Sequence, residues 1–126
     1  MKKLLIALFV PVLLLSACAT QAPAWHTITA EQARAIMADT DGFLLLDVRT
    51  AAEFQQARLH GATLIPYDEI QRRADELPGR DTVVLIYCRT GRRSAIAAAA
   101  LVELGFSAIY DFGGIYDWPF ERIEGG

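Results

Sequence analysis

The chain has 126 residues, of which 53% are hydrophobic and 21% charged, and its formal net charge at pH 7 is −3. This length and composition predict one globular domain with a modest core and exclude a disordered chain. Without the two lysines of the N-terminal leader described next, ten arginines face 15 acidic residues, and the resulting charge of about −5 argues against a nucleic-acid partner.

The first 18 residues form a segment of their own. Lys2 and Lys3 precede an apolar run, Leu4 to Leu15, and a small-residue stretch follows it. A basic start, an apolar centre and a small-residue cleavage zone are typical of a secretory signal peptide. A membrane-spanning helix needs about 20 apolar residues, whereas this run is shorter and contains Pro11. We therefore exclude residues 1–18 from the fold.

The ending Leu15-Ser16-Ala17-Cys18 resembles the bacterial lipobox, whose cysteine is lipidated and becomes the first mature residue. This resemblance implies that a lipid on Cys18 attaches the domain to a membrane surface without spanning the membrane. It implies a periplasmic lipoprotein of the cell envelope, and Ala19 resembles an outer-membrane address if the host is Gram-negative. The alternative is a plain signal peptide cut near Ala17 or Ala22, with Cys18 incidental.

Two capping boxes mark the first helices of the mature chain. Residues 19–24 are small and polar with one proline and predict a tether, which we extend over residues 19–28, so the folded domain is expected over residues 29–126. Thr29-Ala30-Glu31-Gln32 and Thr50-Ala51-Ala52-Glu53 have the capping-box spacing, in which each end residue bonds to the other's backbone N–H. They predict helices that reach to about Asp39 and Ala57.

Apolar runs and glycine or proline punctuation predict the remaining elements. The uninterrupted run that begins at Phe43 is typical of a strand covered on both faces. Further helices are expected over 68–77, before Pro78-Gly79, and over 94–104, before Gly105, and strands over 43–48, 62–65, 82–87 and 107–112. Strands that alternate with helices predict an α/β fold with a parallel sheet between helices.

The stretch Tyr87-Cys88-Arg89-Thr90-Gly91-Arg92-Arg93-Ser94 follows the clearest strand and leads into the clearest helix. Ligands of open α/β sheets bind at the carboxyl ends of the strands, and the N–H groups of such a loop attract anions. A helix N-terminus and nearby arginines lower a thiol pKa from about 8.5. We therefore predict that Cys88 is a nucleophilic thiolate at neutral pH. The alternative is a buried, inert cysteine beside solvated arginines.

Cysteine counting narrows the chemistry further. Cys18 and Cys88 are the two cysteines of the chain, so a lipid on Cys18 would leave Cys88 without an intramolecular disulfide partner. An unpaired cysteine in an exported domain indicates a reactive or intermolecular thiol. A thiol oxidoreductase normally uses a Cys-x-x-Cys pair, which this chain lacks.

Several motifs occur in a characteristic order: Leu46-Asp47-Val48-Arg49 with Glu53-Phe54, Gly61-Ala62 with Ile65-Pro66, the Cys88 stretch, and Gly113-Gly114 with Trp118. Together they resemble the rhodanese-like sulfurtransferases in their single-domain, exported bacterial form, over about residues 43–118. The resemblance implies a rhodanese-like α/β fold, with a central parallel sheet of about five strands and helices on both faces. It implies no metal and no organic cofactor.

The same resemblance implies a two-step sulfur transfer. The Cys88 thiolate attacks the outer sulfur of a donor such as thiosulfate, sulfite leaves, and a thiophilic acceptor (cyanide or a thiol) takes the sulfur from the persulfide. The arginine side chains would bind the dianionic donor, with Arg92 and Arg93 favoured over Arg89. The residues expected to cradle the sulfur with their N–H groups are Arg89, Thr90, Gly91, Arg92, Arg93 and Ser94.

Asp47 and Arg49 are expected to support the loop through an ion pair. The resemblance carries over no role for His60, because the family's histidine position holds Arg58 here. A phosphatase of related fold would place an arginine six positions after the cysteine, where this chain has Ser94. The alternative function is a rhodanese-like sulfur carrier or binding module that depends on a protein partner. The physiological donor, the acceptor and the oligomeric state stay open.

Overall fold

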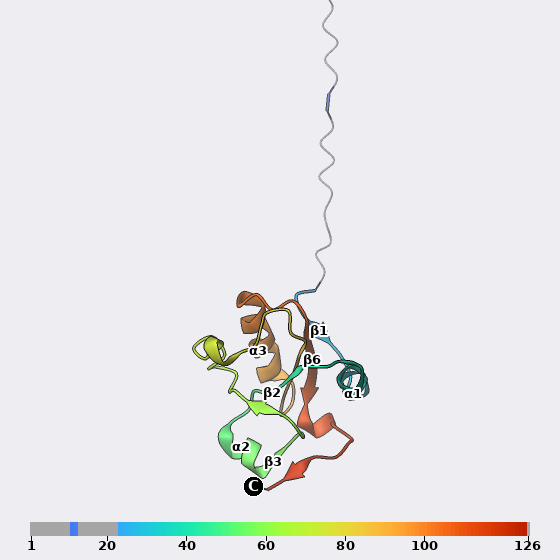
Figure 1. Cartoon of the computed structure of the whole chain (residues 1–126), viewed down its shortest axis with the longest axis vertical. Coiled ribbons are helices and arrows are strands. Elements are labelled where there is room, and N and C mark those ends of the chain that lie inside the picture. Colours follow the sequence, from blue (N-terminus) through green and yellow to red (C-terminus); the bar gives the residue numbers. More distant parts are fainter. Residues whose placement is uncertain (1–10, 13–22, 126) are drawn as a thin grey trace, which may run out of the picture.

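A five-stranded parallel sheet forms the centre of the structure, a computed structural model that describes residues 11–12 and 23–125 (Figure 1). Its strands lie in the order β1-β6-β5-β2-β4. They comprise β1 (His26–Thr27), β2 (Leu44–Asp47), β4 (Thr63–Leu64), β5 (Val84–Cys88) and β6 (Ile109–Gly114). The expected α/β architecture with about five parallel strands is therefore confirmed.

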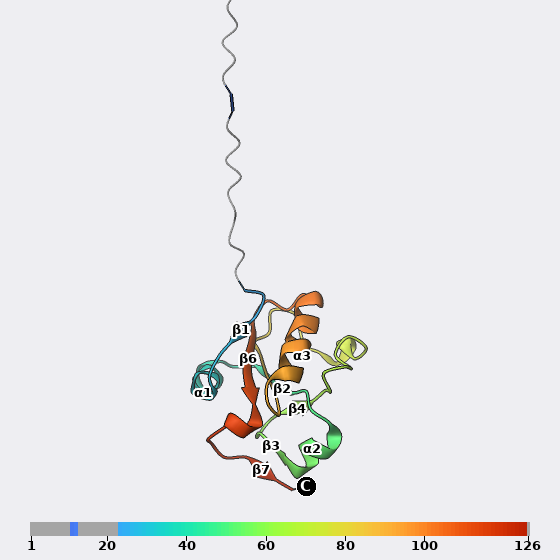
Figure 2. The same ribbon diagram turned by 180° about the vertical axis from the view of Figure 1, so that it is seen from behind.

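Helices cover both faces of this sheet, as expected. Helix α1 (Ala30–Asp39) packs on one face and α3 (Arg92–Glu103) on the other (Figures 1 and 2). The short helix α2 (Ala51–Gln56) leads into a small antiparallel sheet of β3 (Ala57–Arg58) and β7 (Ile123–Glu124). Two 3-10 turns complete the elements: η1 (Ala74–Glu76) and η2 (Ile115–Asp117).

The central strand β5 explains which side chains reach the core on each face. All five of its residues are buried, and a strand points successive side chains to opposite faces. Val84, Ile86 and Cys88 belong to the hydrophobic cluster under α3. Leu85 and Tyr87 belong to the cluster under α1. The thiol of Cys88 therefore lies on the α3 side of the sheet, at the carboxyl end of its central strand.

Both predicted capping boxes are present. The Thr29 hydroxyl accepts from Gln32 N at 3.1 Å and the Gln32 side chain accepts from Thr29 N at 2.9 Å. At α2, Glu53 accepts from Thr50 N at 3.0 Å and Thr50 accepts from Glu53 N at 3.2 Å. These contacts satisfy backbone donors that the first turn of a helix leaves free.

The prediction of a helix over residues 68–77 is wrong. The segment consists of turns and the short η1, seen beside α3 in Figure 2. Ile70 is its single buried side chain, and a helix of this length in water depends on burying a continuous apolar face. Its arginines and acids instead pair locally, as in Arg72 with Glu69 and Arg73 with Glu76.

The sheet begins earlier in the chain than the sequence indicates. His26–Thr27 pairs in parallel with β6, inside the segment 19–28 that was assigned to a tether. The expected leader over residues 1–18, including Cys18, lies outside the described residues apart from positions 11–12. Residues 19–22 of the expected tether lie outside them as well. Among the described residues, none of the helices has the length and apolar character needed to cross a membrane.

Candidate active site

The Cys88 loop turns backbone N–H groups toward the thiol. Gly91, the residue before α3, has φ 110, a conformation that glycine adopts without strain. Its N–H donates to Cys88 Sγ at 2.9 Å. The first turn of α3 follows at once, so the positive end of the helix dipole also faces the sulfur. Cys88 is a free thiol and only 1% exposed.

The end of β6 forms the wall behind this loop. Gly114 is paired with Cys88 across the sheet. A Cβ at Gly114 would collide with the backbone of Arg89 and Thr90, so the loop backbone would have to shift. The Gly113-Gly114 motif therefore allows the loop to pack directly on β6, which keeps the loop amides close to the sulfur.

The hydrogen bonds of the loop lower the pKa of the Cys88 thiol below its ordinary value. Burial by itself would raise that pKa. The backbone N–H and hydroxyl of Ser94 and the backbone N–H groups of Gly91 and Thr90 outweigh it, because they stabilise the thiolate. The sequence attributed this lowering partly to the arginine side chains. The structure assigns it to the backbone amides and the Ser94 hydroxyl, among which the Gly91 N–H lies 2.9 Å from the sulfur.

The three loop arginines have different environments. Arg93 is 15% exposed and forms a two-pronged pair with Glu53, at 2.7 and 2.8 Å. Arg89 is 55% exposed and lies 3.8 Å from the same carboxylate, and Arg92 is exposed, with its guanidinium 5.9 Å from the ring centre of Tyr67. Arg89 and Arg92 are thus the arginines open to an incoming anion, while the charge of Arg93 is largely neutralised.

Glu53 is a site residue that sequence reasoning missed. It was assigned only to the capping box of α2, yet its carboxylate also holds Arg93, 40 positions away. The hydrogen bond from Arg93 lowers the pKa of Glu53 from 4.5 to about 2. The Glu53-Phe54 pair in the ordered motifs was the available signal, but it did not say which arginine Glu53 would meet.

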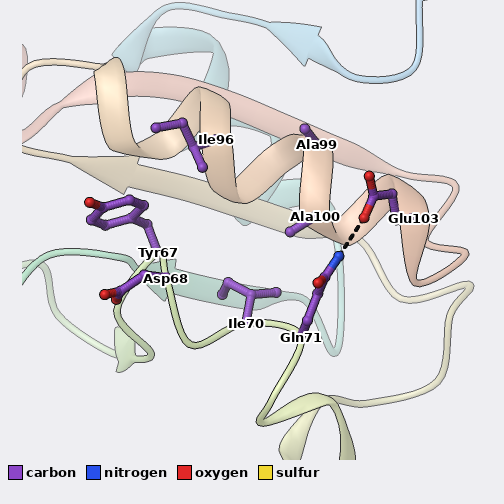
Figure 3. A pocket seen from close by; sticks show the side chains of 8 residues that line it. All are labelled: Tyr67, Asp68, Ile70, Gln71, Ile96, Ala99, Ala100 and Glu103. Atoms are coloured by element: carbon purple, nitrogen blue, oxygen red, sulfur yellow. Dashed lines mark hydrogen bonds between the residues drawn. The ribbon is translucent and has the colours of Figure 1, made fainter.

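A cavity of about 470 Å³ opens in front of the loop. Its lining residues come from α2, the 66–77 segment and the loop itself: Thr50, Glu53, Tyr67, Arg89, Thr90, Arg92 and Arg93. Tyr67 also borders a second groove along α3, of about 330 Å³, which the Gln71–Glu103 hydrogen bond closes at its other end (Figure 3). The first cavity carries the arginines and the polar groups suited to a small anion.

Asp47 and Arg49 form the expected ion pair. Both are buried, and Arg49 Nη2 lies 2.7 Å from Asp47 Oδ2 while donating to the carbonyl of Ala57 at 2.6 Å. The Arg49 guanidinium also lies 5.6 Å from the ring centre of Tyr87, the residue before Cys88. The pair therefore fixes the end of β2 against the end of β5. Its influence on the loop itself stays a prediction.

The remaining candidates lie away from the sulfur. His60 is exposed, and His26 stacks on Tyr110 at the edge of the sheet. Trp118 packs on Phe112, whereas Tyr116 is 68% exposed and has no packing role. No group of His, Cys, Asp and Glu side chains in the described part of the chain has the arrangement of a metal site.

Comparison with known proteins agrees with this geometry. The model of the rhodanese-like domain matches residues 29–119. The chain belongs to the rhodanese-like family. A sulfurtransferase from Allochromatium vinosum is 39% identical over 94 residues, covering 74% of this chain and 87% of the relative. The thiosulfate sulfurtransferase PspE from Escherichia coli is 33% identical over 81 residues, covering 64% and 78%. A solved structure described as rhodanese with anions from E. coli has a TM-score of 0.61 and 32% identity, covering 67% of this chain and all of that one.

The source of the Cys88 pKa can be tested by titration. We expect the rate of alkylation by iodoacetamide to rise with pH around a midpoint below the ordinary thiol value. Ser94→Ala should move the midpoint upward, because it removes the hydroxyl bond to the thiolate. Arg89→Ala and Arg92→Ala should leave it close to wild type. A midpoint that rises more in the arginine variants than in Ser94→Ala would show that the side-chain charges set the pKa.

The Glu53–Arg93 pair predicts a pH-dependent stability. A lowered carboxyl pKa contributes stability above the ordinary value of 4.5 and loses it as the pH falls toward about 2. At pH 7, Glu53→Gln should lower the free energy of unfolding in urea by on the order of 2 kcal/mol. The difference from wild type should shrink by pH 3.

The exposed pair Arg73–Glu76 supplies the matched control. Glu76→Gln should leave the unfolding curve almost unchanged, because exposed ion pairs contribute little. A Glu53→Gln deficit that is the same at pH 7 and pH 3 would contradict the assignment of the pair.

Proposed function

We propose that the protein is a thiosulfate sulfurtransferase that forms a persulfide on Cys88. In the first step the Cys88 thiolate attacks the outer sulfur of thiosulfate. A new S–S bond forms on Cys88, and the S–S bond of thiosulfate breaks with its electron pair leaving on sulfite. In the second step cyanide or a thiolate attacks the outer sulfur of the persulfide, and the Cys88 thiolate returns.

One observation supports this proposal above the others: a sulfur that receives backbone N–H bonds beside a cavity that carries arginines. The N–H groups stabilise negative charge on the sulfur in the thiolate and, on this mechanism, in the persulfide. Arg89 and Arg92 are exposed at the cavity and suit the dianionic donor and the leaving sulfite. The name of the PspE relative points to the same donor.

The position of Ser94 favours sulfur over phosphoryl chemistry. A related phosphatase would need an arginine at this position to hold the phosphoryl oxygens. Here the buried Ser94 places its hydroxyl 3.6 Å from the Cys88 sulfur. The loop therefore presents its donors to a single sulfur atom. The guanidinium of Arg93, the residue before Ser94, is held by Glu53.

A second candidate function is a sulfur carrier that is charged by a protein partner. A similar protein named a putative sulfur carrier, YrkF from Bacillus subtilis, favours this candidate; it is 38% identical over 82 residues, covering 64% of this chain and 44% of that protein. Steady turnover with thiosulfate and cyanide alone separates the two: an enzyme sustains it, whereas a dedicated carrier does not.

Intact mass spectrometry tests the proposed reaction. Incubation of the purified protein with thiosulfate should add the mass of one sulfur atom, and cyanide should remove it with formation of thiocyanate. Cys88→Ser should gain nothing, and Ser94→Ala should gain sulfur more slowly. Absence of the gain in folded wild-type protein would refute the small-donor reaction, and a gain that persists in Cys88→Ser would place the sulfur elsewhere.

We further propose that the full chain is a lipoprotein of the cell envelope, anchored through Cys18 and facing the periplasm of a Gram-negative host. The lipobox-like ending before Cys18 and the outer-membrane-like Ala19 support this. The full chain, produced in such a host, should partition into detergent and carry the mass of a lipid, and Cys18→Ser should lose both. An unlipidated mature chain that begins after Ala17 or Ala22 would instead support a plain signal peptide.

A further inference from the structure

A second, smaller cavity adjoins the one in front of the Cys88 loop. Its volume is about 140 Å³, against about 470 Å³ for the larger, donor cavity. Arg89 and Glu53 line both. The smaller one is also lined by Arg122, which precedes β7, and by Tyr116 of η2, and we call it the Arg122 cavity. The reaction described above makes no use of it.

Two charged residues of the Arg122 cavity are compensated by neighbours outside it. Glu53, the one acid in the lining, is held by Arg93 through hydrogen bonds of 2.7 and 2.8 Å. The buried Arg49, which also lines the cavity, is paired with Asp47 at 2.7 Å. These two ion pairs leave the other two guanidinium groups of the lining without a strong partner in the cavity.

Arg89 and Arg122 are the arginines whose charge is available to a ligand. Arg89 is exposed and lies 3.8 Å from Glu53, which is longer than a hydrogen bond. Arg122 forms an ion pair with Glu124 at 3.6 Å, and both side chains are exposed. Exposed pairs of this kind contribute little, so a ligand carboxylate can replace them at small cost. The exposed Tyr116 adds a hydroxyl that can donate a further hydrogen bond.

We propose that the Arg122 cavity binds the carboxylate of a small thiol that accepts sulfur from Cys88. This rests on the proposed sulfurtransferase function. Guanidinium groups bind carboxylates through paired N–H donors, and two of them line this small cavity. Arg89 directly follows Cys88 and lines both cavities, so a carboxylate bound beside Arg89 holds the thiol of the same molecule near the loop.

The bound acceptor takes part in the second step of the reaction. Its thiolate attacks the outer sulfur of the Cys88 persulfide and forms a new S–S bond. The S–S bond to Cys88 breaks, and its electron pair stays on the Cys88 thiolate. The acceptor leaves as a persulfide that keeps its carboxylate. Thiosulfate and the acceptor carboxylate thus have separate binding places, and Arg89 contributes to both.

The preference for a carboxylate-bearing thiol tests the proposal. Protein loaded by thiosulfate and freed of excess donor is mixed with 3-mercaptopropionate or with 2-mercaptoethanol, and loss of the added sulfur is followed by intact mass. The ratio of the two rate constants is compared between variants, so the intrinsic reactivity of each thiol cancels. Arg122→Gln should lower this ratio about threefold, the effect of one exposed ion pair. Arg122→Lys should retain part of the preference, because it keeps the charge.

Matched variants separate the cavity from a general effect of charge. Arg72→Gln removes the same charge from an exposed arginine that lines neither cavity, and its ratio should equal that of wild type. Glu124→Gln should raise the ratio, because it removes the acid that competes for Arg122, whereas the exposed Glu76→Gln should not.

Thermal melts establish that each variant is folded. A wild-type ratio in folded Arg122→Gln, or an equal fall in Arg72→Gln, overturns the proposal. If Arg122→Gln does not fold, the exposed Glu124→Gln decides, and a ratio no higher than that of Glu76→Gln overturns the proposal.

A binding measurement distinguishes failure of this site from failure of the proposed function. Propionate has the carboxylate but no thiol, and in ¹⁵N-labelled protein without added sulfur it should shift the amide resonances of Ile115 and Tyr116. The apparent Kd should be higher in Arg122→Gln than in Arg72→Gln. If thiosulfate loads no sulfur but these shifts appear, the sulfurtransferase assignment fails and the carboxylate site stands. If sulfur is loaded and transferred but neither the rate ratio nor the shifts depend on Arg122, the site fails and the function stands.

Discussion

The left-handed backbone of Gly91 is the constraint on which the site depends. It bends the chain between the buried strand β5 and helix α3, so that N–H groups before and after it point at one atom, the Cys88 sulfur. Burial of the sulfur disfavours the thiolate, and these donors reverse that preference. A residue with a side chain would be strained at this φ, and the loop would relax by turning amides away from the sulfur.

The rest of the fold serves to hold this bend in place. Neighbouring strands β2 and β6 flank β5, and the Gly113-Gly114 stretch lets the loop pack on the sheet without a side chain between them. The buried Asp47–Arg49 pair fixes the strand end one residue before Cys88, against Tyr87. A rigid frame matters here because an N–H that moves away by a fraction of an ångström loses much of its effect on a thiolate.

Neutral dipoles and full charges have separate tasks in this site. Backbone amides and a hydroxyl set the thiol pKa, while the guanidinium groups of Arg89 and Arg92 face the cavity. Arg93, the most enclosed of the three, is compensated by Glu53. This separation has a chemical advantage, because a thiolate that is stabilised too strongly becomes a poorer nucleophile. On the proposed mechanism, cations that contact the donor would instead lower the barrier where charge moves onto sulfite.

Local patterns in the sequence predicted the elements whose causes are local. The two threonine capping boxes, the buried strand before Cys88 and the glycine-terminated α3 are all present, because caps and periodicity act over a few residues. The prediction of a helix over residues 68–77 was wrong because helix propensity without a buried face cannot stabilise a short helix. The role of Glu53 depends on a contact with Arg93, 40 residues further along the chain, and local spacing in the sequence does not predict such a contact.

Burial of Cys88 is compatible with transfer to an outside acceptor because the proposed persulfide extends outward. An S–S bond adds about 2 Å to the side chain, so the outer sulfur of the persulfide would lie nearer to the cavity than the thiol sulfur does. The donor then needs to present only a terminal sulfur atom at the loop, and the acceptor meets the sulfur at the arginine-lined cavity. On this mechanism, the loop protects the thiolate between turnovers and exposes the sulfur only while it is being carried.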